Sequence, residues 1–137
     1  MKSISEISTG YVYEKSFEIT NDLHRAFIQI SGDDSPIHTD LAFCQRNGFD
    51  KVLGHAFLLT TLLSQIYGKH FPGGNELCLS HTTNFKKPFF ISDILTFKIT
   101  VTNINHSLEL INTSVDVINQ EHVKIFQGNG ILKLSLK

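Results

Sequence analysis

Residues 55–67, which read HAFLLTTLLSQIY, are apolar on nearly every side when they are drawn as a helix. The apolar side chains surround the helix axis instead of forming one stripe, and a helix of this kind is usually buried. In a chain of 137 residues, the neighbouring segments must supply what covers this helix.

The segments after this helix are rich in apolar and polar residues that alternate, which is typical of strands. We predict four strands, over residues 76–85, 94–105, 108–118 and 122–136. The polar runs at residues 105–107 and 119–121 are short enough for antiparallel hairpins. The Gly-Asn-Gly run at residues 128–130 is a candidate for a turn or a bulge. This part of the sequence therefore predicts an antiparallel meander.

The segments before the helix predict one more strand and two more helices. These are a strand over residues 11–19 and helices over residues 21–31 and 41–46. Thr20 is placed to cap the first of these helices and Gly32 to end it. Residues 33–40 have the composition of a turn, within which Thr39 or Asp40 can cap the second helix. The whole order predicts an α+β fold in which an antiparallel sheet curls around the central helix.

Length and composition exclude several classes of protein. The 137 residues and 15.4 kDa predict a single domain over residues 1–137. The formal net charge of −1 leaves no global basic surplus, so we expect neither nucleic acid nor a membrane as a partner. The chain has no secretory signal and no run approaching the roughly 18 apolar residues of a membrane span, so we expect a cytoplasmic protein. The seven His and two Cys residues show no zinc-binding spacing, so no metal site is predicted.

Three motifs lie on either side of the predicted helix and at its start. They read FIQISGDDSPIH at residues 27–38, VLGHAFLL at residues 52–59 and NFKKPFFISDIL at residues 84–95. Taken in order, they resemble the Ser-Gly-Asp-x-Asn-Pro-x-His, His-Gly-Met-Leu and Phe-x-x-Pro-Val-x-x-Gly-Asp-x-Leu patterns of the MaoC-like hot-dog family. The likeness is closest to the (R)-specific enoyl-CoA hydratases and 3-hydroxyacyl dehydratases. In this chain Ser35 stands where the family has Asn, and Ala56 where it has Gly.

The resemblance implies a hot-dog fold and a hydro-lyase of fatty-acid metabolism. Such an enzyme interconverts a trans-2-enoyl thioester and an (R)-3-hydroxyacyl thioester. The resemblance implies that the substrate is carried on CoA or on acyl carrier protein, and the chemistry calls for no metal or redox cofactor. It also implies a homodimer with the active site near the subunit interface.

Hydration of an enoyl thioester needs a positioned, partly deprotonated water and hydrogen-bond donors for the thioester oxygen. A carboxylate and an imidazole can hold one water between them, and the resemblance assigns this role to Asp33 and His38. The first amides of the buried helix suit the thioester oxygen, and the resemblance points to that of Ala56. The predicted oxyanion and substrate-binding set is completed by Ser35, His55 and Ser64.

We predict that the acyl chain runs into an apolar tunnel beside the helix. Candidate walls of this tunnel are Phe57, Leu58 and Phe85. The phosphate-bearing arm of the carrier would lie across the surface, where it could meet Lys51, Lys86 and Lys87.

Each of these residues also has a plainer structural interpretation. Asp33 can form an Asx turn before Ser35. We favour for His55 a structural role beneath the loop over direct catalysis. The hydroxyl of Ser64 can bond back to the preceding turn of the helix.

Two other functions fit the same fold, because a fold alone does not fix an activity. A hot-dog thioesterase would release free thiol from an acyl thioester, whereas a hydratase leaves the thioester intact. A non-catalytic acyl-thioester-binding module would do neither, and the residues at positions 35 and 56 are its best support.

Overall fold

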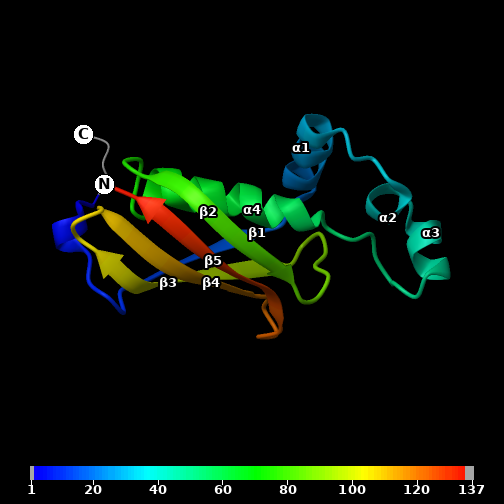
Figure 1. The fold of residues 1–137 in the computed structure, drawn as a ribbon. Helices are drawn as coiled ribbons and strands as arrows, with labels where there is room; N and C mark the ends of the chain where they lie inside the picture. Colours follow the sequence, from blue (N-terminus) through cyan, green and yellow to red (C-terminus); the bar gives the residue numbers. More distant parts are fainter. Residues whose placement is uncertain (1, 135–137) are drawn as a thin grey trace.

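The computed structural model describes residues 2–134. Five antiparallel strands form one sheet, α4 lies along the sheet, and α1, α2 and α3 project at one end of it (Figure 1). This arrangement confirms the predicted α+β fold, in which an antiparallel sheet packs around a central helix. In chain order the elements are η1 (Ile4–Glu6), β1 (Val12–Glu18), α1 (Asn21–Ser31), α2 (Pro36–Thr39), α3 (Leu41–Arg46), α4 (Ala56–Gln65), η2 (Ile66–His70), β2 (Leu77–Phe85), β3 (Ile94–Asn105), β4 (Leu110–Ile118) and β5 (Lys124–Lys133). Within the described range, none of the helices combines the length and the hydropathy that crossing a bilayer requires.

The strand order in the sheet is β1-β3-β4-β5-β2. Strands β3, β4 and β5 pair in sequence order, which confirms that part of the predicted meander. The prediction that β2 belongs to the meander is wrong, because β2 pairs with β5 at the edge farthest from β1. Between β2 and β3, the backbone N–H of Ser92 donates to the carbonyl of Ile19 at 2.8 Å, so that β3 starts beside β1. Alternation along a strand indicates its buried face but not its neighbour in the sheet.

The hydrophobic core lies between the sheet and α4. On β3, the predicted alternation is confirmed by fully buried Leu95, Phe97, Ile99 and Val101. From α4, the side chains that complete the core are Leu58, Leu59, Leu62 and Leu63. Each large apolar side chain removed from water contributes about 1.5–3 kcal/mol, so this contact is what holds α4 to the sheet.

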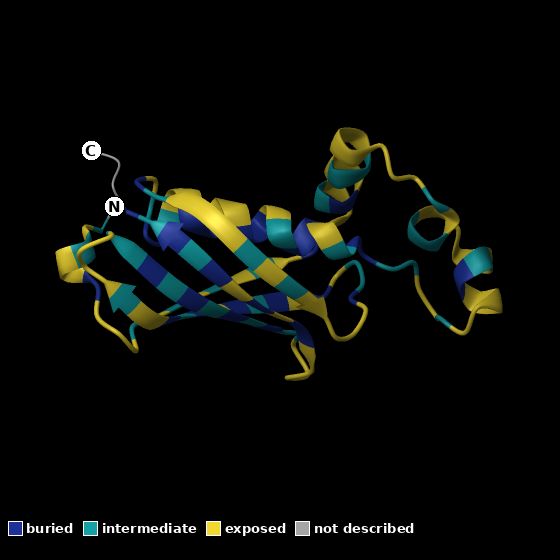
Figure 2. Ribbon diagram, viewed as in Figure 1, coloured by how far each residue is buried: buried dark blue, intermediate teal, exposed yellow. Residues whose placement is uncertain are grey.

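One face of α4 stays open. Phe57, Thr61, Ser64 and Gln65 are exposed, and exposed and buried positions alternate along the helix in Figure 2. The expectation of a helix covered on nearly all sides is therefore wrong for a single chain. The sheet covers one face only, and three of the four residues on the open face are polar.

The Gly-Asn-Gly run does not form the predicted turn or bulge. These residues lie inside β5 and pair with both β2 and β4. A Cβ atom at Gly130 would stand 2.8 Å from Oγ1 of Thr113 and 2.9 Å from the ring of His81, so the glycine permits a close approach. The strand predicted over residues 122–136 begins at Lys124, and its predicted last residues lie outside the described range.

The ends of α1 and α3 are capped as predicted, and the segment between them contains one further short helix. Oγ1 of Thr20 accepts a hydrogen bond from the N–H of the third helical residue at 3.1 Å, and Gly32 ends α1 with a φ of 73°. Within the predicted turn, Pro36–Thr39 form one helical turn, α2. Asp40, not Thr39, caps α3 through its carboxylate. These ends fix the loop that carries the candidate site.

Candidate active site

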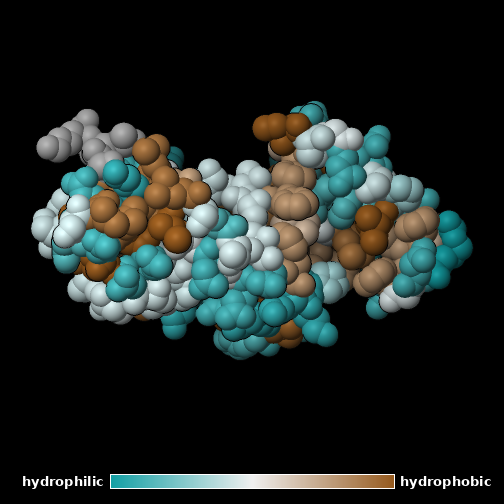
Figure 3. All heavy atoms as spheres, viewed as in Figure 1, coloured by the Kyte–Doolittle hydropathy of each residue, from teal (hydrophilic) through white to brown (hydrophobic). Residues whose placement is uncertain are grey.

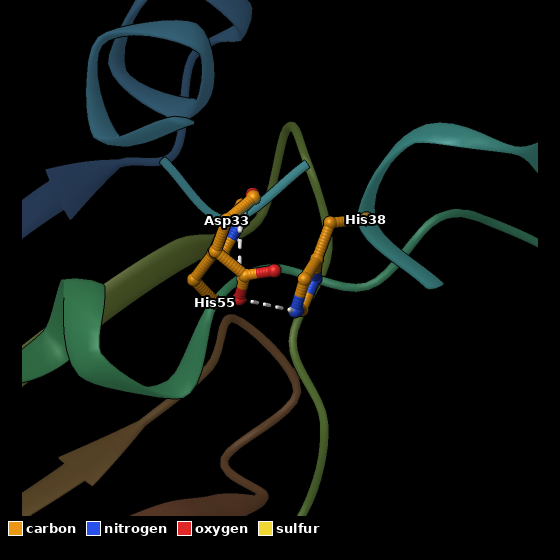
Figure 4. Close-up of side chains that lie close together, drawn as sticks. All are labelled: Asp33, His38 and His55. Atoms are coloured by element: carbon orange, nitrogen blue, oxygen red, sulfur yellow. Dashed lines mark hydrogen bonds and ion pairs between the residues drawn. The ribbon is translucent and has the colours of Figure 1, made fainter. Parts of the chain in front are cut away.

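A cavity of about 480 Å³ opens between the loop after α1 and the start of α4. Four predicted site residues line it, namely Asp33, His38, His55 and Ala56. The first three side chains point toward one another from the loop, from α2 and from the residue before α4 (Figure 4). Most of the other lining side chains are apolar: Phe27, Ile37, Leu53, Phe57, Leu59, Phe85, Pro88 and Phe89. A small polar group therefore stands at the end of an apolar cavity.

Asp33 is held by Ser35, the residue that replaces the family's Asn. The hydroxyl of Ser35 donates to Oδ1 of Asp33 at 2.7 Å, and the backbone N–H of Ser35 donates to the same oxygen at 3.2 Å. These bonds stabilise the charged form and are the main reason that the pKa of Asp33 is lowered, with the nearby His38 and His55 acting in the same direction. Asp33 is therefore a carboxylate, and its Oδ2 remains available to another group.

His38 presents one nitrogen to that free oxygen. Its Nδ1 lies 2.7 Å from the backbone carbonyl of Leu53, which can only accept, so Nδ1 carries the proton. Nε2 of the neutral ring then bears a lone pair, and it lies 3.7 Å from Oδ2 of Asp33. This distance is too long for a direct hydrogen bond, and it leaves the two atoms able to hold one water between them.

His55 packs beneath both residues, which agrees with the structural role favoured from the sequence. Its ring stacks on that of His38 with centroids 3.7 Å apart, and its Nε2 donates to the carbonyl of Asp33 at 2.9 Å. Burial lowers the pKa of His55, and the bond to the carbonyl opposes this only in part. His55 is thus neutral at pH 7, and its Nδ1 is buried without a hydrogen-bond partner among the described residues.

His24 is a site residue that the sequence analysis missed. It is 4 % exposed on α1, and its Nε2 donates to the backbone carbonyl of His38 at 2.9 Å. This bond fixes the backbone from which His38 projects. The available signal was its position on α1, next to Leu23 and one helical turn before Phe27, on the side that packs inward.

Asp33, His38 and His55 also offer ligand atoms that lie within 4.8 Å of one another, an arrangement that can hold a cation. A metal requires lone pairs that converge on one point. The rings of His38 and His55 lie only 24° from parallel, and Nε2 of His55 carries the proton that it donates to Asp33. The lone pairs of the two rings do not converge, so this arrangement suits a bound water and proton transfer better than a metal.

The start of α4 supplies hydrogen-bond donors next to these residues. His55 is the N-cap and makes no side-chain capping bond, and the N–H of Leu58 is already taken by the His55 carbonyl. The amides of Ala56 and Phe57 are therefore the donors that the helix leaves without an intrahelical acceptor. A Cβ on Gly54 would overlap the ring of Phe89, so this glycine lets the chain pass close to that ring on its way into α4.

The remaining predicted residues do not all line the cavity that holds Asp33. Ser64 does not line the cavity described above but a second one of about 550 Å³, beside the open face of α4. Lys86 and Lys87 line the first cavity, as proposed for a phosphate-bearing arm, whereas Lys51 lies elsewhere. Among the predicted tunnel walls, Phe57 and Phe85 line the first cavity, and Leu58 is buried in the core.

Curated proteins of similar sequence are hydratases and dehydratases of acyl-CoA. The chain is 28 % identical over 109 residues to an (R)-specific enoyl-CoA hydratase of Aeromonas caviae, covering 80 % of this chain and 81 % of that protein. It is 32 % identical over 87 residues to a 3-hydroxybutyryl-CoA dehydratase of Methylorubrum extorquens, covering 64 % of this chain and 55 % of that one.

Solved structures agree with the fold. The A. caviae (R)-hydratase involved in PHA biosynthesis superimposes with a TM-score of 0.88 and 26 % identity, covering 93 % of this chain and 97 % of that one. R-hydratase PhaJ1 of Pseudomonas aeruginosa superimposes with a TM-score of 0.91 and 22 % identity, covering 98 % and 86 %. The model of the MaoC like domain matches residues 3–123, and the chain therefore belongs to the MaoC-like family.

Proposed function

We propose that the protein is a hydratase and dehydratase that interconverts a trans-2-enoyl thioester and an (R)-3-hydroxyacyl thioester. One observation carries this proposal: Oδ2 of Asp33 and Nε2 of His38 face each other across 3.7 Å, in a cavity that the free amides of α4 also border. The names of the similar proteins support the same reaction.

In the hydration direction, Asp33 and His38 hold a water whose oxygen attacks the β-carbon of the enoyl group. Oδ2 of Asp33 accepts one hydrogen bond from the water, and Nε2 of His38 takes the proton that the water loses. That proton is then delivered to the α-carbon, so that the net change is addition of H and OH across the double bond. Positioned acid–base groups of this kind contribute about 10²–10⁴ in rate.

As the water attacks, negative charge develops on the thioester oxygen. The N–H of Ala56 is the donor we assign to this oxygen, with the positive end of the α4 dipole behind it. Removing one such donor from an active site costs about 10²–10³ in rate. An alanine at this position keeps the N–H, so the replacement of the family's Gly removes no donor.

The rest of the cavity suits an acyl thioester on CoA or on acyl carrier protein. Its apolar lining fits the acyl group, and Lys86 and Lys87 border it where carrier phosphates would pass. The reaction adds or removes a proton and a hydroxyl group without oxidation or reduction, so we assign no redox cofactor to it. We assign no metal either, because the lone pairs of His38 and His55 do not converge on one point.

We further propose that the protein forms a homodimer through the edge of the sheet at β2. This edge lies at one end of the strand order, and its exposed apolar residues include Leu77, Leu79 and Phe85. Figure 3 shows hydrophobic surface at the end of the sheet where β2 begins and β5 ends. An unpaired strand with exposed apolar side chains is a ready template for a second copy.

The test of the reaction is an assay of the purified protein with crotonyl-CoA, which follows loss of the enoyl thioester, release of thiol and the configuration of the product. We expect hydration to the (R)-alcohol, lowered by about 10²–10⁴ in Asp33→Asn and in His38→Gln. Asp22→Asn and His106→Gln change an exposed carboxylate and an exposed imidazole outside the site and serve as matched controls.

The same assay separates the alternatives. Thiol release without hydration would identify a thioesterase. Binding of saturated acyl-CoA with neither reaction, on crotonyl-CoA or on longer enoyl thioesters, would identify a binding module.

A further inference from the structure

Phe57 lines both the cavity that holds Asp33 and the cavity that holds Ser64. No other described residue is shared by the linings of these two cavities. Phe57 is 65 % exposed on the open face of α4, and its ring meets that of Phe85 edge-on, with centroids 5.7 Å apart. The Phe57 side chain is thus the wall between the two spaces.

The second cavity continues the first along the helix. It runs between the open face of α4 and the side of β2 that faces this helix, with Thr60, Ser64 and Gly68 on one side and Cys78 and His81 on the other. Ser64 follows Phe57 by seven residues, which is about 10 Å along the helix axis. An acyl chain that passed Phe57 would therefore have a further groove to occupy in the same direction.

The ring of Phe57 and the ring of Phe85 that it contacts are held differently. Phe85 also packs against the buried ring of Phe126, with centroids 5.6 Å apart, and so has contacts on both sides. Phe57 is mostly exposed, and the edge contact with Phe85 is its one aromatic contact among the described residues. Phe85 is thus held on both sides, and Phe57 is the ring that has room to move.

We propose that Phe57 is the barrier that sets the length of acyl chain this protein accepts. The inference rests on the proposed function, because it takes the thioester to be bound beside Asp33 and Ala56. A short acyl group then fits within the first cavity. A long acyl group must displace Phe57 to reach the second cavity, and it loses affinity in doing so.

The test compares kcat/KM for trans-2-dodecenoyl-CoA and crotonyl-CoA in the wild type, in Phe57→Ala and in Phe57→Trp. One methylene admitted to or refused by an apolar pocket changes kcat/KM by about tenfold or more. The wild type is expected to prefer crotonyl-CoA, Phe57→Ala to raise the ratio of long to short substrate by about tenfold or more, and Phe57→Trp to lower it. Ile30→Ala removes an apolar side chain that is 83 % exposed and lines neither cavity, so its ratio should equal that of the wild type.

The proposal fails if the ratio of kcat/KM for the long and short substrates is the same in Phe57→Ala as in the wild type. It also fails if the wild type already accepts both substrates equally. A second measurement keeps this test separate from the test of the reaction. The dissociation constants of butyryl-CoA and dodecanoyl-CoA, measured by calorimetry on the same proteins, need no turnover. Tighter dodecanoyl-CoA binding by Phe57→Ala without any hydration supports the barrier and overturns the proposed reaction, whereas unchanged dodecanoyl-CoA binding overturns the barrier.

Discussion

Ser35 donates two hydrogen bonds to the same oxygen of Asp33, one from its hydroxyl at 2.7 Å and one from its backbone at 3.2 Å. Both bonds go to Oδ1, which leaves Oδ2 for the water that we place between Asp33 and His38. The residue that departs from the family pattern thus keeps the carboxylate anchored. The replacement of Asn by Ser is therefore no sign of a lapsed site.

The Ser35 hydroxyl gives a prediction about pH. Ser35→Ala removes the bond that lowers the pKa of Asp33 most, so this pKa should rise. Asp33 would then lose its charge at a higher pH on acidification, and the midpoint of its carboxyl titration, followed by carbon-13 NMR of the labelled side chain, should move to higher pH. Ser35→Thr keeps a hydroxyl and should leave this midpoint in place. If the midpoint stays where it is in Ser35→Ala, the Ser35 hydroxyl does not stabilise the charged form of Asp33.

His55 gives a prediction about stability. Its pKa in the folded protein lies below the ordinary value of about 6.5, so below that pH the unfolded chain binds a proton that the folded chain does not. The free energy of unfolding should therefore fall as the pH drops below about 6.5, and partly buried His81, whose pKa is also lowered by desolvation, adds to the same trend. His55→Phe keeps a ring against His38 and should make this fall shallower.

Urea denaturation at a series of pH values measures this slope. His106→Gln, a change at an exposed histidine of the β3–β4 connection, should have the slope of the wild type. Identical slopes for the wild type and His55→Phe would show that His55 does not contribute to the pH dependence.

Gly54 gives a prediction about packing. Gly54→Ala would drive a Cβ into the ring of Phe89, which is 2 % exposed and has little room to move. Overpacking of this kind costs about 1–3 kcal/mol of stability, and here it also displaces the start of α4. We expect a lower free energy of unfolding and slower hydration.

A double-mutant cycle isolates the contact. In a Phe89→Ala background, Gly54→Ala should lower the free energy of unfolding clearly less than it does in the wild type, because the ring that the new Cβ would meet is gone. An equal loss of unfolding free energy in both backgrounds would show that the effect comes from the backbone of Gly54 and not from its contact with Phe89.

The edge at β2 gives a prediction about assembly. Leu79→Lys puts a charge on the exposed edge strand and should convert a dimer into a monomer, as measured by light scattering after gel filtration. Leu108→Lys places the same charge at a residue of similar exposure, 57 % against 56 %, in the β3–β4 connection. It should leave the dimer intact. A wild type that is monomeric at all concentrations would refute this interface.

Asp33 and His38 were identified because the motif at residues 27–38 resembles the family pattern, and the structure places Oδ2 of Asp33 3.7 Å from Nε2 of His38. The ends of α1 were predictable because its cap at Thr20 and its end at Gly32 are local signals. His24 was not predictable as a site residue, because it meets the His38 carbonyl only once α1 has packed against the loop.

The position of Ser64 depends on the rotation of α4 about its own axis, which its nearly uniform apolar pattern does not determine. The place of β2 in the sheet depends on where the chain crosses between residues 85 and 94, and the alternation of residues along the strand carries no record of that crossing.

The hydrogen bond from Nδ1 of His38 to the carbonyl of Leu53 has a consequence for the direction of the reaction. Nδ1 keeps its proton whether the ring is neutral or charged, so this anchor is the same before and after each proton transfer. In the proposed reaction, Nε2 is therefore the one ring nitrogen that takes up and releases protons, and hydration and dehydration need no ring flip or tautomer change between them. The same resting geometry serves addition and elimination of water, and the balance between them is left to the concentrations of the two thioesters.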